Sequence, residues 1–476
     1  MDQLVEAREA PERTTEKGWE PRIVAMVCNW CTYAGADMAG TARRVYAPSV
    51  RIVRFLCTGR IDPLFIVKAF EQGADGVVVS GCHPGDCHYV QGNLLARRRF
   101  TVFQALMDFL GLDRRRLHFA WISASEGVKW SRIVDEATAA VREAGPLRHW
   151  GRPVKGNSSA QPLLPDTDAG IAPRDPPSAE ENQLITGHLQ ELVTNLLSDG
   201  TVSTVIGYTA GSLPQQMVPL FVNEPRDAST LGWNEHCANN LVIYLPQVLK
   251  KNRDAKIGLV TKSCDARALI PLIREGQLRR EQIVLLGIPC RGMWNQGKMA
   301  AKCYSCSEEV SPFTDWTITP EGTKKGSLTS AERRQVSPDP RDREIASLGS
   351  FLPEERWDYW QRQFDRCLRC YACRAVCPLC YCATCISDKN RPQWIPTTID
   401  GKGNMAWNVV RAMHLAGRCI GCDECARVCP AGIRLDLLNR GLVQEIERRF
   451  DFCSHVNPES SPPLTTFQPD DPDEFI

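Results

Sequence analysis

The sequence predicts a multidomain α/β protein with a helical, cysteine-rich C-terminal part, and two observations carry this prediction. Apolar runs of strand length alternate with amphipathic helical runs in two regions of the 476-residue chain, as expected for mainly parallel sheets. The 22 cysteines form three groups, and the densest group accompanies helical runs near the C-terminus. We therefore expect an α/β domain over 20–150, a linker over 151–182, a second α/β domain over 183–350, a helical cysteine-rich domain over 351–456, and a disordered acidic tail over 457–476.

The N-terminal domain repeats one pattern, a buried strand that ends at a cysteine. Residues 21–30, 51–59 and 73–87 each follow this pattern, and a helical run over 63–73 separates the last two. Ligands of parallel sheets bind beyond the carboxyl ends of the strands, which is where these cysteines would lie. The candidate metal ligands of this domain are Cys28, Cys31, Cys57, Cys82 and Cys87.

A segment rich in proline, glycine, aspartate and serine separates this domain from the next, which is typical of a linker. The second domain begins with an amphipathic helix over 181–200. Further strands and helices are expected over 201–210, 239–249, 256–264, 264–276 and 281–290. Helical runs over 404–417 and 434–450 flank the last cysteine motif, and the closing PDDPDEFI is acidic and proline-rich.

Composition excludes several classes of function. A formal net charge of +1 gives no global attraction to nucleic acid or to a membrane surface. The first 21 residues lack the apolar core of a signal peptide. No apolar run approaches the roughly 18 residues of a membrane span. We therefore expect a cytoplasmic protein, in which thiols stay reduced and clustered cysteines bind metal rather than form disulfides.

The last cysteine group contains the most specific chemical signal, the motif C-x2-C-x2-C-x3-C-P, which occurs twice. In two-cluster ferredoxins the first three cysteines of such a motif bind one [4Fe–4S] cluster, and the fourth binds the other cluster. Zinc sites use paired C-x2-C knuckles without the cysteine–proline step, which disfavours zinc here. The predicted ligands are Cys367, Cys370, Cys373 and Cys429 for one [4Fe–4S] cluster, and Cys419, Cys422, Cys425 and Cys377 for the other.

Seven further cysteines leave two metal assignments open. They are Cys264, Cys290, Cys303, Cys306, Cys380, Cys382 and Cys385. In one assignment the first four hold a third [4Fe–4S] cluster. In the other, the Cys303–Cys306 pair meets the Cys382–Cys385 pair over zinc or a cubane. The alternative to both is a set of buried free thiols, which we also expect for the isolated Cys237 and Cys453.

The N-terminal sequence resembles a known family. The stretches VCNWCTYAGADMAGTAR, RFLCTGRIDP and GADGVVVSGCHPGDCHY, within about residues 20–145, resemble the delta (iron–sulfur) subunit of methyl-viologen-reducing hydrogenases. The resemblance implies one [2Fe–2S] cluster and electron transfer to the flavoprotein subunit of heterodisulfide reductase. Five cysteines serve four ligand places, and we expect the spare one to be Cys31 or Cys57. His83 and His88 are expected to bond to the loop backbone rather than to metal.

The chain over about residues 180–450 resembles a second family. The stretches IGLVTKSCDARALIPLI, VLLGIPCRGM and CLRCYACRAVCPLCYCATC resemble the beta subunit family of deazaflavin-dependent hydrogenases and formate dehydrogenases. The helices around the last motif resemble the α-helical ferredoxins of heterodisulfide reductase and succinate dehydrogenase. These resemblances imply iron–sulfur clusters, often with FAD, beside a catalytic partner subunit. The sequence has no G-x-G-x-x-G and no G-K-[ST] loop, so FAD rests on the resemblance alone.

The sequence contains no acid–base or nucleophile motif, so no catalytic residue is predicted. A row of one-electron carriers predicts conduction within a hetero-oligomeric complex of anaerobic metabolism. We expect an iron–sulfur electron-transfer subunit between a hydrogenase or formate dehydrogenase donor and a heterodisulfide-reductase-like flavoprotein that bifurcates electrons. The alternatives are a flavin-containing beta subunit that acts on a small redox carrier, and a zinc-stabilised assembly scaffold. Two arginine triplets, 97–99 and 114–116, are candidate docking sites.

Overall fold

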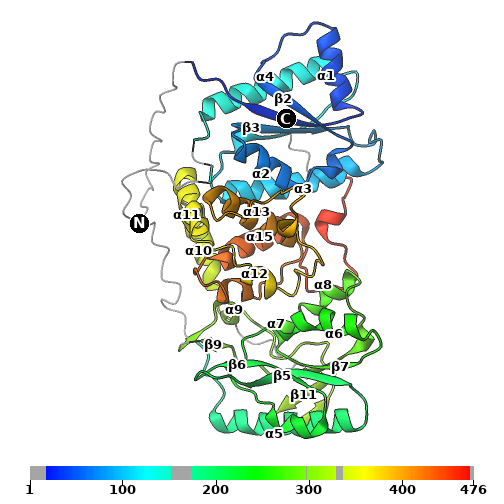
Figure 1. Ribbon diagram of the computed structural model, residues 1–476, viewed down its shortest axis with the longest axis vertical. Helices are drawn as coiled ribbons and strands as arrows, with labels where there is room; N and C mark the ends of the chain where they lie inside the picture. Colours follow the sequence, from blue (N-terminus) through cyan, green and yellow to red (C-terminus); the bar gives the residue numbers. More distant parts are fainter. Residues whose placement is uncertain (1–17, 149, 152–172, 296, 328–335, 472–476) are drawn as a thin grey trace, which may run out of the picture. The chain divides into compact units, whose positions relative to one another are not determined.

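The computed structural model describes five stretches of the chain: residues 18–148, 150–151, 173–295, 297–327 and 336–471. Most of the expected linker, residues 152–172, lies outside the described residues. The chain divides into two compact units, whose elements Figure 1 labels. The first unit comprises residues 1–155, 400–406 and 467–476, and the second comprises residues 156–399 and 407–466.

The first unit contains a four-stranded parallel sheet, which confirms the predicted N-terminal α/β domain. Its strands, in the order β2-β1-β3-β4, are Val50–Phe55, Ile23–Cys28, Gly76–Gly81 and Leu117–Trp121. Strands β1, β3 and β4 are almost wholly buried and rich in apolar residues, as strands covered on both faces are. Strand β2 forms one edge and is largely exposed. The carboxyl ends of β1 and β3, which lead into cysteines, therefore lie side by side in the sheet interior.

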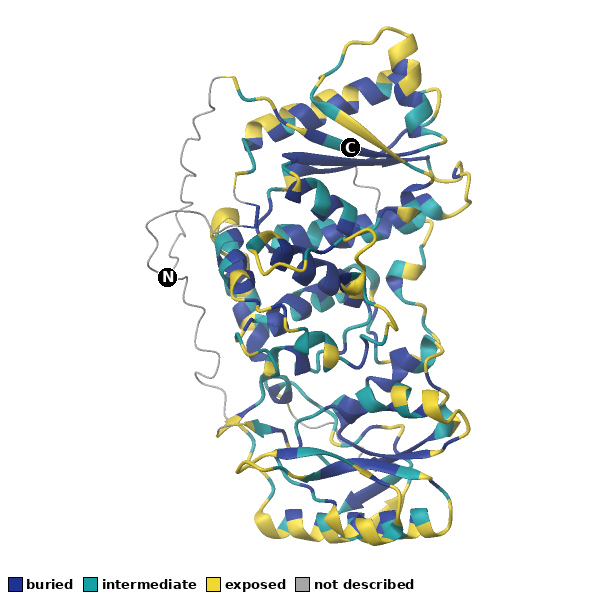
Figure 2. Ribbon diagram, in the orientation of Figure 1, coloured by how far each residue is buried: buried dark blue, intermediate teal, exposed yellow. Residues whose placement is uncertain are grey.

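Helices cover both faces of this sheet, with α1 and α4 on one face and α2 and α3 on the other (Figure 1). Their bounds are α1 (Thr32–Thr41), α2 (Pro63–Glu71), α3 (Gly92–Phe109) and α4 (Gly127–Ala144). Helix α2 begins where the sequence signals a start, because Asp62 caps it by accepting the N–H of Leu64 at 2.9 Å. Trp130 of α4 is fully buried in the core that α1 and α4 form with the sheet. Figure 2 shows the strands of this sheet mostly in the colour of buried residues.

The second unit contains a six-stranded sheet with a parallel centre and antiparallel edges. In the order β12-β11-β8-β7-β5-β6, its strands are Gly322–Lys325, Trp316–Thr319, Ile283–Gly287, Ile257–Thr261, Thr204–Ala210 and Met217–Val222. The helices of this part are α5 (Ala179–Ser198), α6 (Leu245–Lys251), α7 (Ser263–Ala266), α8 (Leu269–Arg274) and α9 (Ala301–Tyr304). A small hairpin, β9 (Trp294–Asn295) with β10 (Lys298–Met299), precedes α9. As in the first unit, cysteines follow the central parallel strands.

The C-terminal cysteines lie among helices. These are α10 (Pro340–Gly349), α11 (Pro353–Asp365), α12 (Ala372–Ala375), α13 (Gly401–Leu415), α14 (Glu424–Arg427) and α15 (Leu435–Phe450). Between residues 340 and 466, all of which are described, the chain forms no strand. Residues 183–350, expected as one domain, share a compact unit with most of residues 351–456, expected as another, while residues 400–406 belong to the first unit. The reason is a common core, in which Leu379, Leu415 and Ile420 pack with residues of the six-stranded sheet.

Buried arginines of both triplets bond to partners within the first unit. This argues against a role of these arginines as free docking sites. Arg97 is 1% exposed and donates to the Gln468 carbonyl at 2.7 Å. Arg98 forms a bidentate pair with Asp471, with N···O distances of 2.5 and 2.7 Å. Arg116 is buried and donates to backbone carbonyls.

The segment expected to be a disordered tail, residues 457–476, is described as far as residue 471. Its described part contains a short 3-10 helix, Pro463–Thr465, and the ion pair of Asp471, so this part takes a defined course. Residues 472–476 lie outside the described residues. Among the helices of the described chain, none is long and apolar enough to cross a membrane.

Candidate metal centres

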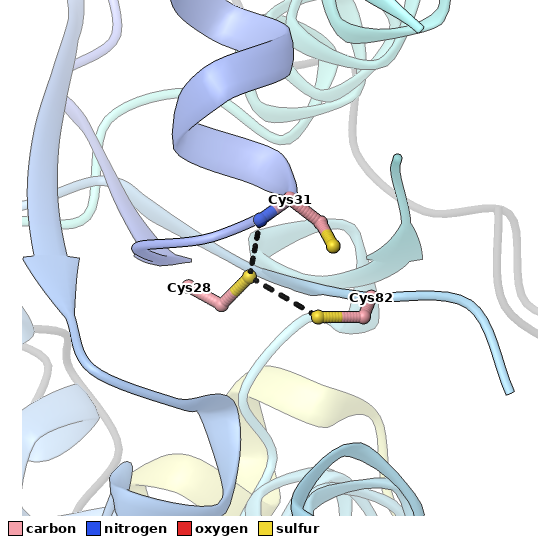
Figure 3. Close-up of side chains that lie close together, drawn as sticks. All are labelled: Cys28, Cys31 and Cys82. Atoms are coloured by element: carbon pink, nitrogen blue, oxygen red, sulfur yellow. Dashed lines mark hydrogen bonds between the residues drawn. The ribbon is translucent and has the colours of Figure 1, made fainter. Parts of the chain in front are cut away.

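Three cysteines of the first unit meet at the carboxyl end of its sheet (Figure 3). Cys28 is the last residue of β1, Cys31 immediately precedes α1, and Cys82 follows β3. Their Sγ atoms all lie within 4.8 Å of one another. The Sγ atoms of Cys28 and Cys82 are 3.5 Å apart, and the backbone N–H of Cys31 donates to Cys28 Sγ at 3.3 Å. The turn after β1 and the end of β3 thus bring three thiols to one point.

The two remaining cysteines of this unit lie beside these three. The Sγ atoms of Cys57 and Cys87 are 3.9 Å apart, and all five cysteines form one packed cluster. Cys57 follows the edge strand β2, and Cys87 lies in the loop between β3 and α3. Five unpaired thiols in one place suit an iron–sulfur cluster, which takes four ligands. Both candidates for the spare thiol, Cys31 and Cys57, remain within the cluster.

A close approach to sulfur explains the glycine that begins α3. A Cβ atom at Gly92 would lie 2.3 Å from Cys57 Sγ and 3.6 Å from Cys87 Sγ. The next residue, Asn93, is buried and donates its side-chain amide to the carbonyl of Cys82 at 2.9 Å. These two residues hold the loop against the thiols. Sequence reasoning missed both residues. The signal for them is a helix whose first residue is glycine and whose capping position holds no preferred capping residue.

The pKa values of the thiols in the first unit shift in opposite directions. A hydrogen bond from Cys82 lowers the pKa of Cys28 to about 5, and the same bond, together with burial, raises the pKa of Cys82. Burial raises the pKa of Cys57 to about 11, and it also raises the pKa of Cys31. These three raised values disfavour several thiolates together near pH 7 unless a cation compensates their charge. A metal supplies that compensation, because it binds thiolates and releases their protons.

The two histidines near this cluster have partners other than the loop backbone that we expected. His83 Nε2 lies 2.7 Å from Glu126 Oε2, and the same oxygen accepts the backbone N–H of Ser123 at 2.7 Å. The His88 ring stacks on the ring of Trp30, with centroids 4.0 Å apart. A carboxylate therefore replaces the expected backbone partner of His83, and an aromatic ring replaces that of His88.

In the second unit, each fourth cysteine lies close to the other motif. Burial raises the pKa of Cys367 and of Cys373, and the nearby Cys429 thiol adds to both rises. The nearby Cys377 thiol likewise adds to the raised pKa values of three cysteines of the second motif, Cys419, Cys422 and Cys425. This proximity supports the crossed ligand assignment of two-cluster ferredoxins.

The two motifs also share one backbone geometry. The residue after the second cysteine is left-handed in each motif, with φ of 59° at Tyr371 and φ of 59° at Asp423. Each of these residues precedes a one-turn helix, α12 or α14. A left-handed conformation is unfavourable for a residue with a Cβ atom. Since two unlike side chains adopt it at the same place, the loop that holds the thiols imposes the conformation.

Besides Cys419 of the second motif, four cysteines that precede both motifs in the sequence line one cavity of the second unit, with a volume of about 100 Å³. They are Cys264, Cys290, Cys303 and Cys306. Burial raises the pKa of Cys264 to about 12. The cavity also contains Cys453, which we expected to be an isolated buried thiol, and its Sγ lies 3.4 Å from His455 Nδ1. Cys382 and Cys385 are absent from this lining, so the cavity does not bring the Cys303–Cys306 pair together with the Cys382–Cys385 pair.

The three cysteines that end the dense run lie outside that cavity lining. The thiol of Cys380 hydrogen-bonds with that of Cys377, which lowers the pKa of Cys380 and raises that of Cys377. Cys382 is exposed, and the backbone N–H of Cys385 donates to Asp388 at 3.2 Å. Cys380 therefore lies beside Cys377, the fourth cysteine of the first motif. Cys237 is fully buried, as expected of a free thiol.

The comparisons with known proteins match the N-terminal region of the chain. Residues 23–145 match the family model described as methyl-viologen-reducing hydrogenase, delta subunit. The iron-sulfur subunit of the F420-non-reducing hydrogenase of Archaeoglobus profundus is 51% identical over 130 residues, which are 27% of this chain and 95% of that protein. The chain belongs to the delta-subunit family. The iron-sulfur subunit of the vhc F420-non-reducing hydrogenase of Methanococcus voltae is 50% identical over 130 residues, 27% of this chain and 90% of that protein.

The delta-subunit domain also occurs within a larger protein. One subunit of the ferredoxin:CoB-CoM heterodisulfide reductase of Methanosarcina mazei is 42% identical over 134 residues, which are 28% of this chain but only 17% of that protein. The five cysteines of the first unit lie inside the matched delta-subunit region of residues 23–145. The cysteines of the second unit lie beyond it, so their assignment rests on motif spacing and on the geometry described above.

Proposed function

We propose that this chain is an iron–sulfur electron-transfer subunit of a hetero-oligomeric oxidoreductase complex. It would link a hydrogenase or formate dehydrogenase donor to a heterodisulfide-reductase-like flavoprotein that bifurcates electrons. The observation that carries the proposal is the set of five unpaired thiols gathered at the carboxyl end of the sheet in a delta-subunit domain. The relatives that share this domain are named as an iron–sulfur subunit of a hydrogenase and as a subunit of heterodisulfide reductase.

We assign one [2Fe–2S] cluster to four of the five N-terminal cysteines. We assign [4Fe–4S] clusters to Cys367, Cys370, Cys373 and Cys429, to Cys377, Cys419, Cys422 and Cys425, and to the cavity cysteines Cys264, Cys290, Cys303 and Cys306. Such clusters, when bound, accept and release single electrons. The chain's own part is to hold the thiols in pre-formed loops, to shield nearly all of them at least partly from water, and to surround them with fixed charges.

Burial raises the pKa of two of these thiols, Cys57 and Cys264, which disfavours free thiolates there. A free thiol with a pKa of about 11 or 12 binds its proton firmly at pH 7, as Cys57 and Cys264 do. Both residues gain from a metal that replaces the proton, since the buried negative charge is then compensated. The same argument disfavours a role for these cysteines as exposed redox-reactive thiols.

The experiment that tests the proposal is quantification of iron, acid-labile sulfide, zinc and flavin on the anaerobically purified full chain, with EPR of the reduced protein. Three cubanes and one [2Fe–2S] cluster require about 14 irons per chain, and two cubanes require about ten. Stoichiometric zinc without sulfide would establish a zinc-stabilised scaffold and overturn the proposal. Bound FAD with turnover of a small redox carrier by the isolated chain would favour the flavin-containing beta subunit.

Two matched variants locate the third cubane. Cys303→Ser removes a thiol of the cavity and should lower the iron content by about four per chain. Cys382→Ser alters an exposed thiol outside the cavity lining and should leave the iron content unchanged. If Cys382→Ser lowers the metal content as much as Cys303→Ser does, the two pairs share a site and the cavity assignment is wrong.

A further inference from the structure

One buried arginine lies among thiols of both ferredoxin motifs. Arg411 belongs to α13, the helix between the two motifs, and is 5% exposed. Its guanidinium donates to the backbone carbonyl of Cys373, in the first motif, at 3.0 Å. Its strongest electrostatic partners are all thiols, namely Cys425, Cys377, Cys373 and Cys380. The arginine therefore faces both proposed clusters from a single position.

The hydrogen bonding of this guanidinium is incomplete among the described residues. Arg411 Nε is buried and has no hydrogen-bond partner. A buried charge that lacks a counter-charge costs several kcal/mol, and a buried donor without an acceptor costs about 1–3 kcal/mol more. A folded core tolerates such a group where another feature of the site compensates it. The nearby groups that can do so are sulfur ligands, which carry negative charge once they bind a cluster.

A second arginine nearby provides the contrast. Arg418, at the end of the same segment, also lies near Cys380, but its guanidinium pairs with the carboxylate of Glu275 at 2.6 and 2.7 Å. The positive charge of Arg418 is thus neutralised by a carboxylate. Lys302 lies near Cys422 and donates to its carbonyl at 2.7 Å, but the carboxylate of Glu424 is close to it as well. Of these three cations, Arg411 has thiols alone as its strongest partners.

We propose that Arg411 is a positioning residue that raises the reduction potentials of both ferredoxin-type clusters through its fixed charge. The inference rests on the proposed function, because it needs both clusters to be present. Reduction adds negative charge to a cluster, and a buried cation beside the ligands favours that added charge in a medium of low dielectric constant. The effect is larger for the cluster of Cys377, Cys419, Cys422 and Cys425, since Cys425 and Cys377 are the strongest partners of Arg411.

The test compares three variants of the full chain by EPR-monitored redox titration. Arg411→Gln should shift both [4Fe–4S] signals to more negative potential. We expect at least a tenfold change in the reduction equilibrium of the Cys377 cluster, which equals about 59 mV for one electron. Arg411→Lys keeps the charge and should retain most of the wild-type potential. Arg418→Gln, which removes an arginine already paired with Glu275, should leave both potentials within a few-fold of wild type.

Iron and sulfide content separates the possible failures. If Arg411→Gln keeps its clusters and titrates as wild type does, the inference is wrong. If Arg411→Gln and Arg411→Lys both lose a cluster, Arg411 is needed for assembly and its charge is not the reason, which also overturns the inference. Loss in Arg411→Gln with a wild-type titration in Arg411→Lys supports the role of charge. A wild-type chain without [4Fe–4S] signals would instead refute the proposed function itself.

Discussion

The two kinds of cysteine site in this chain are built in opposite ways. In the first unit, thiols come from the ends of different strands, and the sheet holds them in place, as with Cys28 after β1 and Cys82 after β3. In the two ferredoxin motifs of the second unit, thiols come from short loops that repeat one backbone geometry, as at Tyr371 and Asp423. The first design depends on tertiary packing, whereas the second takes three of its four predicted ligands from about ten residues of sequence and the fourth from the other motif.

The charges of the two units differ in a related way. Two buried arginines of the first unit, Arg97 and Arg98, pair with the carboxylate of Asp471. In the second unit, Arg411 has thiols as its strongest partners. The fold of the first unit is therefore expected to be stable without metal, while the second unit needs its clusters to compensate a buried charge.

The largest expected effect tests the repeated motifs. Cys429→Ser should remove the same cluster as Cys367→Ser, and Cys377→Ser the same cluster as Cys419→Ser, because the fourth cysteine of each motif lies near the other motif. In each variant one [4Fe–4S] EPR signal disappears and the [2Fe–2S] signal of the first unit persists. If Cys429→Ser and Cys419→Ser abolish the same signal, the motifs are not crossed.

The second prediction concerns the carboxylate that pairs with Arg98. Asp471→Asn leaves two arginines without their counter-charge, so the free energy of unfolding of the first unit should fall by about 3 kcal/mol at pH 7. Arg98 lowers the pKa of Asp471 against the opposing effect of burial. A carboxyl with a lowered folded pKa stabilises above its unfolded pKa of about 3.9, and this contribution is lost as the pH falls through the folded value.

The difference between wild type and Asp471→Asn should therefore shrink as the pH falls below about 3.9, and it is lost fully only below the lowered folded pKa of Asp471. Chemical denaturation at pH 7 and at pH 3, followed by the fluorescence of the buried tryptophans, measures it. The control is Arg114→Gln, whose partner Asp108 forms an exposed pair that should contribute under about 1 kcal/mol. Equal losses in the two variants would show that the Asp471 pair is no more buried than a surface pair.

The third prediction tests how closely the first unit packs around sulfur. Gly92→Ala places a methyl group at 2.3 Å from Cys57 Sγ, so the loop or the thiol must move. We expect loss of [2Fe–2S] content and a fall of about 2 kcal/mol in the free energy of unfolding. Gly40→Ala on α1, where nothing lies within 4 Å of the added atom, should leave the cluster intact. A fully loaded Gly92→Ala protein would show that Cys57 is the spare thiol and can turn away.

The same contrast explains what the sequence could predict. The parallel sheet of the first unit was predicted, because apolar runs of strand length alternate with amphipathic helical runs in its sequence. The ligand sets of the repeated motifs follow from spacing and remain predictions that the proximity of the thiols supports. Gly92 and Arg411 could not be foreseen, since their roles depend on atoms distant in the sequence. The packing of Leu379 and Ile420 into a core with strands far from them along the chain could not be foreseen either.

The smallest expected effect asks whether the first unit binds metal through thiols alone. His83 bonds to Glu126, and both side chains are about one-third exposed, so His83→Ala should cost only about 0.5 kcal/mol of stability. The visible and EPR spectra of the [2Fe–2S] cluster should stay as in wild type. A histidine ligand raises the reduction potential of such a cluster, so its loss in His83→Ala would appear as a markedly lower potential. That result would place the first unit among mixed histidine–thiolate sites, and an unchanged potential would show that His83 is not a ligand of the cluster.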